Sequence, residues 1–85
     1  MLIYKSVYKW EDGVCLGEVL DFPGTVAGGA TLDEARASLA SALSDMAETN
    51  LLRGESLPLP NPTLTDANSE LDEPIYLMCW FAPQR

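Results

Sequence analysis

One long amphipathic helix is the element that most constrains how this chain can fold. Thr31 followed three residues later by Glu34 forms a capping box, in which each side chain satisfies a backbone amide of the first helical turn. Apolar residues then recur at intervals of three to five and form one stripe. The stripe consists of Leu32, Ala35, Leu39, Leu43, Met46 and Leu51 or Leu52. Gly54 after Arg53 is typical of a helix end, so we expect a helix over residues 32–53.

The segment before this helix has the composition of β-strands. β-branched and aromatic residues are dense over residues 2–10, and apolar residues return over residues 14–20. Asp12 and Gly13 between these segments are a strong hairpin signal, because both tolerate positive φ. A short third strand is expected over residues 25–28. The first thirty residues therefore predict a three-stranded antiparallel meander.

The segment after the helix is expected to be a connector followed by one more strand. Residues 55–74 contain four prolines and five acidic residues and show no lasting helical or strand period. Residues 75–82 are almost entirely apolar and predict the last strand. The order of elements is then β-β-β-α-β in an α+β fold, and the length of 85 residues suits a single domain over residues 1–85.

The last strand does not alternate with polar residues, so both of its faces should be covered. One face suits the helix stripe, and it consists of Ile75, Leu77, Cys79 and Phe81. The other face has the aromatic and methionine content of protein interfaces, and it consists of Tyr76, Met78 and Trp80. One helix cannot cover both faces, so the sequence predicts self-association through the second face.

The charge of the chain argues against several classes of function. Thirteen acidic residues against five basic ones and no histidine give a net charge of −8, and a nucleic-acid-binding domain would need a basic patch. No apolar run is long enough to span a membrane, and the N-terminus lacks the pattern of a signal peptide, so we expect a cytoplasmic protein. The acids gather in turns and in the connector, where we expect them to be available to a basic protein partner.

Catalytic and cofactor motifs are missing from the sequence. The lack of histidine excludes histidine-dependent nucleophiles, and Cys15 and Cys79 have no zinc spacing, so both are expected to be buried, small apolar residues and no cofactor is expected. Glu18 and Asp21 near the end of a strand could hold Mg²⁺ in a minimal nuclease. The plainer interpretation, which we favour, gives Asp21 the role of capping the turn that follows it and makes Glu18 the polar half of an alternating strand.

The order of short motifs resembles that of the HicB family of antitoxins. The chain reads Gly-Glu-Val-Leu-Asp-Phe-Pro-Gly over residues 17–24, then a glycine and Thr-x-x-Glu-Ala leading into the helix, and then Gly-x-x-x-Pro after it. The matching positions are Asp21, Pro23, Gly24, Gly29, Thr31, Glu34, Ala35, Gly54 and Pro58. The chain departs from the family at Leu20, Phe22 and Thr25, where proline, leucine and cysteine are common.

The resemblance implies a partial ribonuclease-H-like fold that has no metal-binding active site. Members of the family bind and block HicA, a small basic ribonuclease, associate as dimers or tetramers, and often carry a second, DNA-binding domain. Because this chain ends at Arg85, we expect it to lack that domain. The leading hypothesis is a non-catalytic HicB-like antitoxin or an orphan relative. The alternatives are a nuclease that uses Glu18 and Asp21, and an oligomeric adaptor without a toxin.

Overall fold

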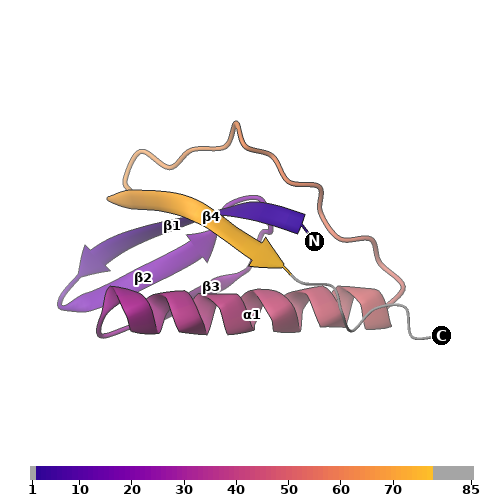
Figure 1. Cartoon of the computed structure of the whole chain (residues 1–85), viewed down its shortest axis with the longest axis horizontal. Coiled ribbons are helices and arrows are strands. Elements are labelled where there is room, and N and C mark those ends of the chain that lie inside the picture. Colours follow the sequence, from indigo (N-terminus) through magenta and orange to yellow (C-terminus); the bar gives the residue numbers. More distant parts are fainter. Residues whose placement is uncertain (1, 78–85) are drawn as a thin grey trace.

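A single helix lies across one face of a four-stranded antiparallel sheet (Figure 1). The structure is a computed structural model, and it describes residues 2–77. Its elements are β1 (Leu2–Glu11), β2 (Val14–Val19), β3 (Val26–Gly29), α1 (Leu32–Leu52) and β4 (Leu71–Leu77). The order of strands in the sheet is β3-β2-β1-β4, so the predicted meander and the predicted α+β fold are confirmed. The bounds of the first three strands and the helix differ from the predicted ones by one residue.

The hairpin between β1 and β2 has the tight turn that the sequence predicts. Asp12 has a φ of 51° and Gly13 a φ of 79°, and Glu11 pairs with Val14 across the turn. Both central residues therefore adopt the left-handed region, which aspartate tolerates and glycine enters without strain. This turn fixes the register between β1 and β2.

The hydrophobic core lies between α1 and the sheet face that the helix covers. Buried side chains from all layers contribute to it, and they include Tyr4, Tyr8, Cys15, Val19, Phe22, Ala35, Leu39, Leu43, Ala47, Ile75 and Leu77. Cys15 is completely buried as predicted, and burial raises the pKa of its thiol, whereas Cys79 lies outside the described residues. Burial likewise raises the pKa of the Tyr8 phenol. Both groups are therefore less readily ionised in the folded state than in solvent.

The helix begins at the predicted cap. The Thr31 hydroxyl accepts a hydrogen bond from the Glu34 amide at 3.1 Å, and Glu34 Oε1 accepts one from the Ala30 amide at 2.9 Å. The predicted apolar stripe is wrong at the other end, because Leu51 and Leu52 are exposed and Ala47 takes the last core position. Figure 1 shows the reason: the last turns of α1 continue past the ends of the strands.

The last strand begins earlier than predicted. β4 starts at Leu71, so residues 71–74 belong to the sheet and the connector is shorter than the predicted 55–74. Pro74 is tolerated because β4 is an edge strand, where the missing amide of a proline breaks no ladder hydrogen bond. Ile75 and Leu77 face the helix as predicted. Met78, Trp80 and the rest of the predicted strand lie outside the described residues.

Candidate functional site

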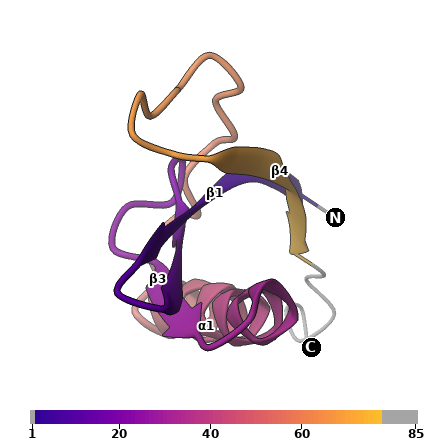
Figure 2. The ribbon, with the colours of Figure 1, turned by 90° about the vertical axis from the view of Figure 1, so that its left-hand side faces the viewer.

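The sheet face turned away from α1 is the candidate interaction surface, and we call it the outer face. The helix covers only the opposite side of the sheet, and the connector crosses part of the outer face (Figure 2). Alternation along the strands places these side chains on it: Ile3, Lys5, Val7, Lys9, Val14, Leu16, Glu18, Val26, Asp72, Pro74 and Tyr76. This surface mixes apolar and charged groups.

Asp21 holds the connector against the sheet. Its side chain is buried, with 5 % of the residue exposed, and its Oδ1 accepts a hydrogen bond from the Lys5 amide at 2.8 Å while Oδ2 accepts one from the Asn61 amide at 2.9 Å. The prediction that Asp21 caps its own turn is therefore wrong. Because both carboxylate oxygens already accept backbone hydrogen bonds, Asp21 is also poorly suited to hold a metal ion with Glu18.

Three further hydrogen bonds, from the side chains of Tyr4 and Lys5, hold the path of the connector. The Tyr4 hydroxyl donates a hydrogen bond to the Pro58 carbonyl at 2.7 Å. The Lys5 amine donates to the Pro62 carbonyl at 3.0 Å and to the Leu64 carbonyl at 2.8 Å. The first half of the connector is thus bound to β1 by side chains that come from both faces of that strand.

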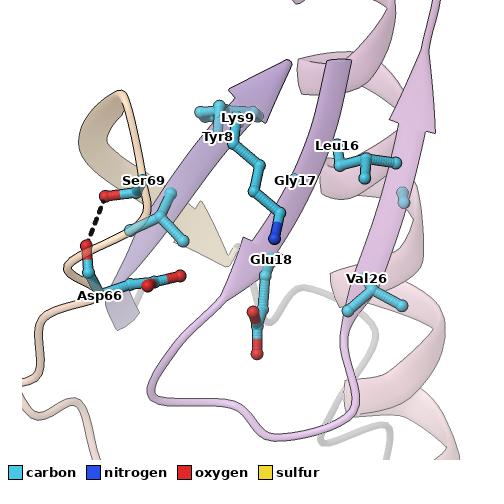
Figure 3. A pocket seen from close by; sticks show the side chains of 10 residues that line it. Tyr8, Lys9, Leu16, Gly17, Glu18, Val26, Asp66 and Ser69 are labelled. Atoms are coloured by element: carbon cyan, nitrogen blue, oxygen red, sulfur yellow. Dashed lines mark hydrogen bonds between the residues drawn. The ribbon is translucent and has the colours of Figure 1, made fainter. Parts of the chain in front are cut away.

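A groove of about 360 Å³ opens on the outer face beside the connector (Figure 3). We call it the outer groove, and its main side chains are Val7, Lys9, Leu16, Glu18, Val26 and Asp66. Cross-strand pairing places Glu18 between Val7 on β1 and Val26 on β3. Asp66 and Ser69 of the connector form the opposite wall (Figure 3). The groove therefore has an apolar floor with a carboxylate on the floor and another on the wall.

The acidic groups of the groove have unfilled hydrogen-bonding capacity within residues 2–77. Asp66 Oδ1 accepts a hydrogen bond from the Asn68 amide at 2.9 Å, and its other oxygen makes no recorded contact in this part of the chain. Glu18 forms no ion pair there either. The amine of Lys9, which also lines the groove, lies 3.7 Å from Glu11 Oε2. The groove can accordingly accept hydrogen bonds from a cationic group.

A second hollow of about 490 Å³ lies farther along the outer face, toward the start of β1. Its walls include Ile3, Pro60, Pro62 and Pro74. Ile3 pairs across the strands with Tyr76, and these residues are 48 % and 55 % exposed. Tyr76 therefore stands on an exposed apolar patch, which is where self-association was predicted. No metal site accompanies it: within the described residues, no three histidine, cysteine, aspartate or glutamate side chains gather closely enough.

The residues that match the HicB pattern do not gather in one place. Each supports local geometry instead. Gly24 and Gly54 have φ values of 90° and 75°, and Pro23 lies in the same turn as Gly24. Ala35 is a core residue at the point where α1 meets the sheet. A Cβ atom on Gly29 would lie 2.6 Å from Glu34 Cβ, so glycine permits β3 to approach the helix.

An ion pair that the sequence did not reveal joins the helix to the edge strand. Arg36 Nε and a terminal nitrogen donate to the two oxygens of Glu73 at 2.8 and 2.9 Å, and a second terminal nitrogen lies 3.2 Å from Asp33. The Glu73 carboxylate raises the pKa of Arg36 above its ordinary value. A second acid of the predicted connector is also engaged, because the Glu70 carboxylate accepts a hydrogen bond from the Trp10 amide at 3.0 Å. The expectation that the connector acids are all available to a partner is therefore wrong.

Comparison of the chain with protein-family models and with curated proteins finds no match. Among solved structures, the chain is similar to the crystal structure of the N-terminal domain of the Burkholderia pseudomallei antitoxin HicB. The two share 20 % sequence identity with a TM-score of 0.74, and the match covers 91 % of this chain and 99 % of the other. No helix of the described residues is long and apolar enough to cross a membrane. The chain has the fold of the N-terminal domain of a HicB antitoxin.

Proposed function

We propose that this chain is a non-catalytic protein-binding module that acts as a HicB-like antitoxin. Its target would be a small basic ribonuclease of the HicA type in the cytoplasm. The observation that carries the proposal is the shared fold with the N-terminal domain of an antitoxin over 91 % of the chain. The resemblance of the short sequence motifs to those of the HicB family supports it as well.

Electrostatics also favours a basic partner. The net charge is −8, and such a charge accelerates association with a positively charged protein through long-range attraction. The described residues contain four cationic side chains, Lys5, Lys9, Arg36 and Arg53. The first three already contact oxygen atoms of the same chain. Little positive charge is left to offset the acidic surface.

The alternative of a nuclease is weakened by the position of Asp21, whose two oxygens are occupied by backbone amides of β1 and the connector. Glu18 by contrast lies on the open outer face. A site for a catalytic metal needs several oxygen ligands with unfilled coordination sites, and the pair does not supply them.

The proposal predicts that a neighbouring reading frame encodes a small basic protein, and it is tested by co-expressing this chain with that protein. Induction of that protein alone should arrest growth, and co-expression of this chain should restore growth. The two proteins should purify together at low salt, and the complex should weaken as the ionic strength rises. Growth arrest without rescue, together with no co-purification, would contradict the proposal. The control for toxicity is a variant of the basic protein whose catalytic motif is inactivated by a substitution that keeps the net charge.

We also propose that a second copy of this chain binds to the face that carries Tyr76, together with the sequence-predicted Met78 and Trp80. The support is that Tyr76 and its cross-strand neighbour Ile3 are both about half exposed on an edge strand. A dimer or tetramer formed there would bury this apolar patch. An oligomer without any ribonuclease partner would favour the adaptor alternative.

A further inference from the structure

We propose that the outer groove binds a basic side chain, arginine or lysine, that a protein partner presents to the sheet. This inference deepens the proposed function and rests on it, because the antitoxin's target would be the basic protein in question. The groove lies on the outer face (Figure 3), and the helix leaves that face of the sheet open (Figure 2).

The shape of the groove suits a long side chain with a charged end. Val7 and Leu16 form an apolar floor, and Val26, which is 61 % exposed, forms one wall. The methylene stem of arginine or lysine can bury apolar area on such a floor while its charged end stays at the rim. The volume of about 360 Å³ is ample for one such side chain.

Two carboxylates, one on the floor and one on the connector wall, supply the acceptors that the charged end needs. Glu18 stands between Val7 and Val26 in the sheet register, so its strand neighbours on both sides are apolar. Asp66 faces it from the connector, with one oxygen committed to the Asn68 amide (Figure 3). A guanidinium or ammonium group placed between these two carboxylates would gain charge-assisted hydrogen bonds.

Lys9 is the internal competitor for this position. Its side chain reaches along the floor of the groove in the direction of Glu18 (Figure 3), and its amine lies 3.7 Å from Glu11. One amine cannot neutralise three carboxylates, so the groove remains negative with Lys9 in place. A partner cation would push the Lys9 amine toward Glu11, where it already has a contact.

A second copy of the chain is a poorer occupant than a basic protein. Of the four cations within residues 2–77, Arg53 alone contacts no carboxylate or carbonyl oxygen through its side chain. The acidic surface of one copy would repel that of the other near the groove. Charge complementarity therefore selects a partner richer in arginine and lysine than this chain.

The first experiment measures affinity for the small basic protein used in the co-expression test, or for a ribonuclease of the HicA type. Glu18→Gln and Asp66→Asn keep side-chain size, and asparagine can still accept from the Asn68 amide. Each should weaken binding about three- to fivefold, and the double variant about tenfold or more. Glu48→Gln on the exposed side of α1 is the matched control, because it removes the same charge far from the groove. Lys9→Gln should strengthen binding.

The second experiment uses a probe that does not depend on the toxin. N-acetyl-arginine methylamide, titrated at millimolar concentration, should shift the amide resonances of Val7, Leu16, Glu18 and Val26 in wild type, and the double variant should show no such shifts. If the basic protein binds but the groove variants match the Glu48→Gln control, the groove inference is wrong and the proposed function stands.

The remaining outcomes separate the two proposals. If the arginine probe shifts the groove but the basic protein does not bind, the antitoxin proposal fails and a site for basic side chains remains. If neither binds, both fail. The wild type could also self-associate as its concentration rises, and Val26→Lys could abolish this association. That result would mean that a second copy of the chain occupies the groove, and it would overturn the inference. Circular dichroism of every variant should match wild type, since Glu18 and Val26 are exposed.

Discussion

Arg36 and Glu73 lie 37 residues apart in the sequence and join the helix to the edge strand through two parallel hydrogen bonds of 2.8 and 2.9 Å. The Ser6 hydroxyl donates to the backbone carbonyl of the same Glu73 at 2.8 Å, so one residue of β4 is held from α1 and from β1. An edge strand pairs with one neighbouring strand only, so Glu73 gives β4 an additional attachment to the helix beyond its pairing with β1.

Replacing Arg36 by methionine should lower the urea midpoint while leaving the slope of the transition unchanged, because a surface contact is lost and the fold is kept. The effect should shrink at high salt, since the Arg36 side chain is partly exposed. A double-mutant cycle with Glu73→Gln checks the pairing. Additive effects of the two substitutions would mean that the ion pair contributes nothing of its own.

Asp21→Asn should destabilise the protein by about 1–3 kcal/mol, the cost of leaving a buried amide unsatisfied. Asparagine offers one acceptor oxygen where Asp21 uses two, for the amides of Lys5 and Asn61. Urea unfolding gives the free energy, and hydrogen exchange should show faster exchange at one of these two amides. Asp12→Asn is the matched control, because asparagine also tolerates the positive φ of that turn. Equal loss in the two variants would contradict the assigned role of Asp21.

Gly29→Ala should cost about 1–3 kcal/mol through overpacking. The added methyl group would lie 2.6 Å from Glu34 Cβ and 2.8 Å from the Ala35 nitrogen, so β3 would have to move away from the helix. Gly28→Ala serves as the graded comparison, since its nearest atom is the Cys15 carbonyl oxygen at 3.1 Å. Thermal unfolding should show the larger decrease for Gly29→Ala, and the reverse order would refute this account of the helix contact.

The free energy of unfolding should fall as the pH rises above 9, the ordinary pKa of a thiol. Burial raises the pKa of Cys15, so the folded state holds its proton at a pH where the unfolded state has released it. The unfolded state then binds fewer protons, and stability decreases with pH from 9 toward the folded pKa. Urea titrations between pH 7.5 and 10 under reducing conditions measure the slope. Cys15→Ala should flatten it, at the cost of a lower stability at neutral pH.

Tyr76→Ser should shift the protein toward the monomer in sedimentation velocity at tens of micromolar. Tyr76 is exposed on the outer face, so the substitution should leave the melting temperature of the monomer nearly unchanged. Leu52→Ser is the control, because Leu52 is an exposed apolar residue at the end of α1, on the opposite side of the sheet. A wild-type protein that sediments as a monomer at this concentration would remove the self-association proposal.

Local signals explain why much of the fold could be predicted. The Asp12-Gly13 turn and the Thr31 cap depend on residues within a few positions of each other, and both occur as predicted. The start of β4 was missed because Pro74 breaks the strand pattern, and only the position of β4 at the edge of the sheet makes a proline acceptable there.

The candidate site was harder to predict, because its parts come together through long-range contacts. Asp21 meets Asn61 across 40 positions, and Asp66 reaches a groove whose other carboxylate is Glu18. No spacing in the sequence indicates such pairs, since the connector has no period and its path is set by β1. The predicted role of Glu18 as the polar residue of an alternating strand agrees with its exposed position.

The anchoring of the connector at Pro58, Asn61, Pro62 and Leu64 has a consequence for when the groove exists. The floor belongs to the first hairpin, whereas the Asp66 wall arrives with a segment that follows the helix. During synthesis, the hairpin emerges long before its wall, and the two meet after the connector has been laid down on β1. A single cut between Leu64 and Asp66 would separate the wall from these anchor points while leaving the hairpin intact. A partner that requires the groove would therefore recognise only finished, unbroken copies of the chain.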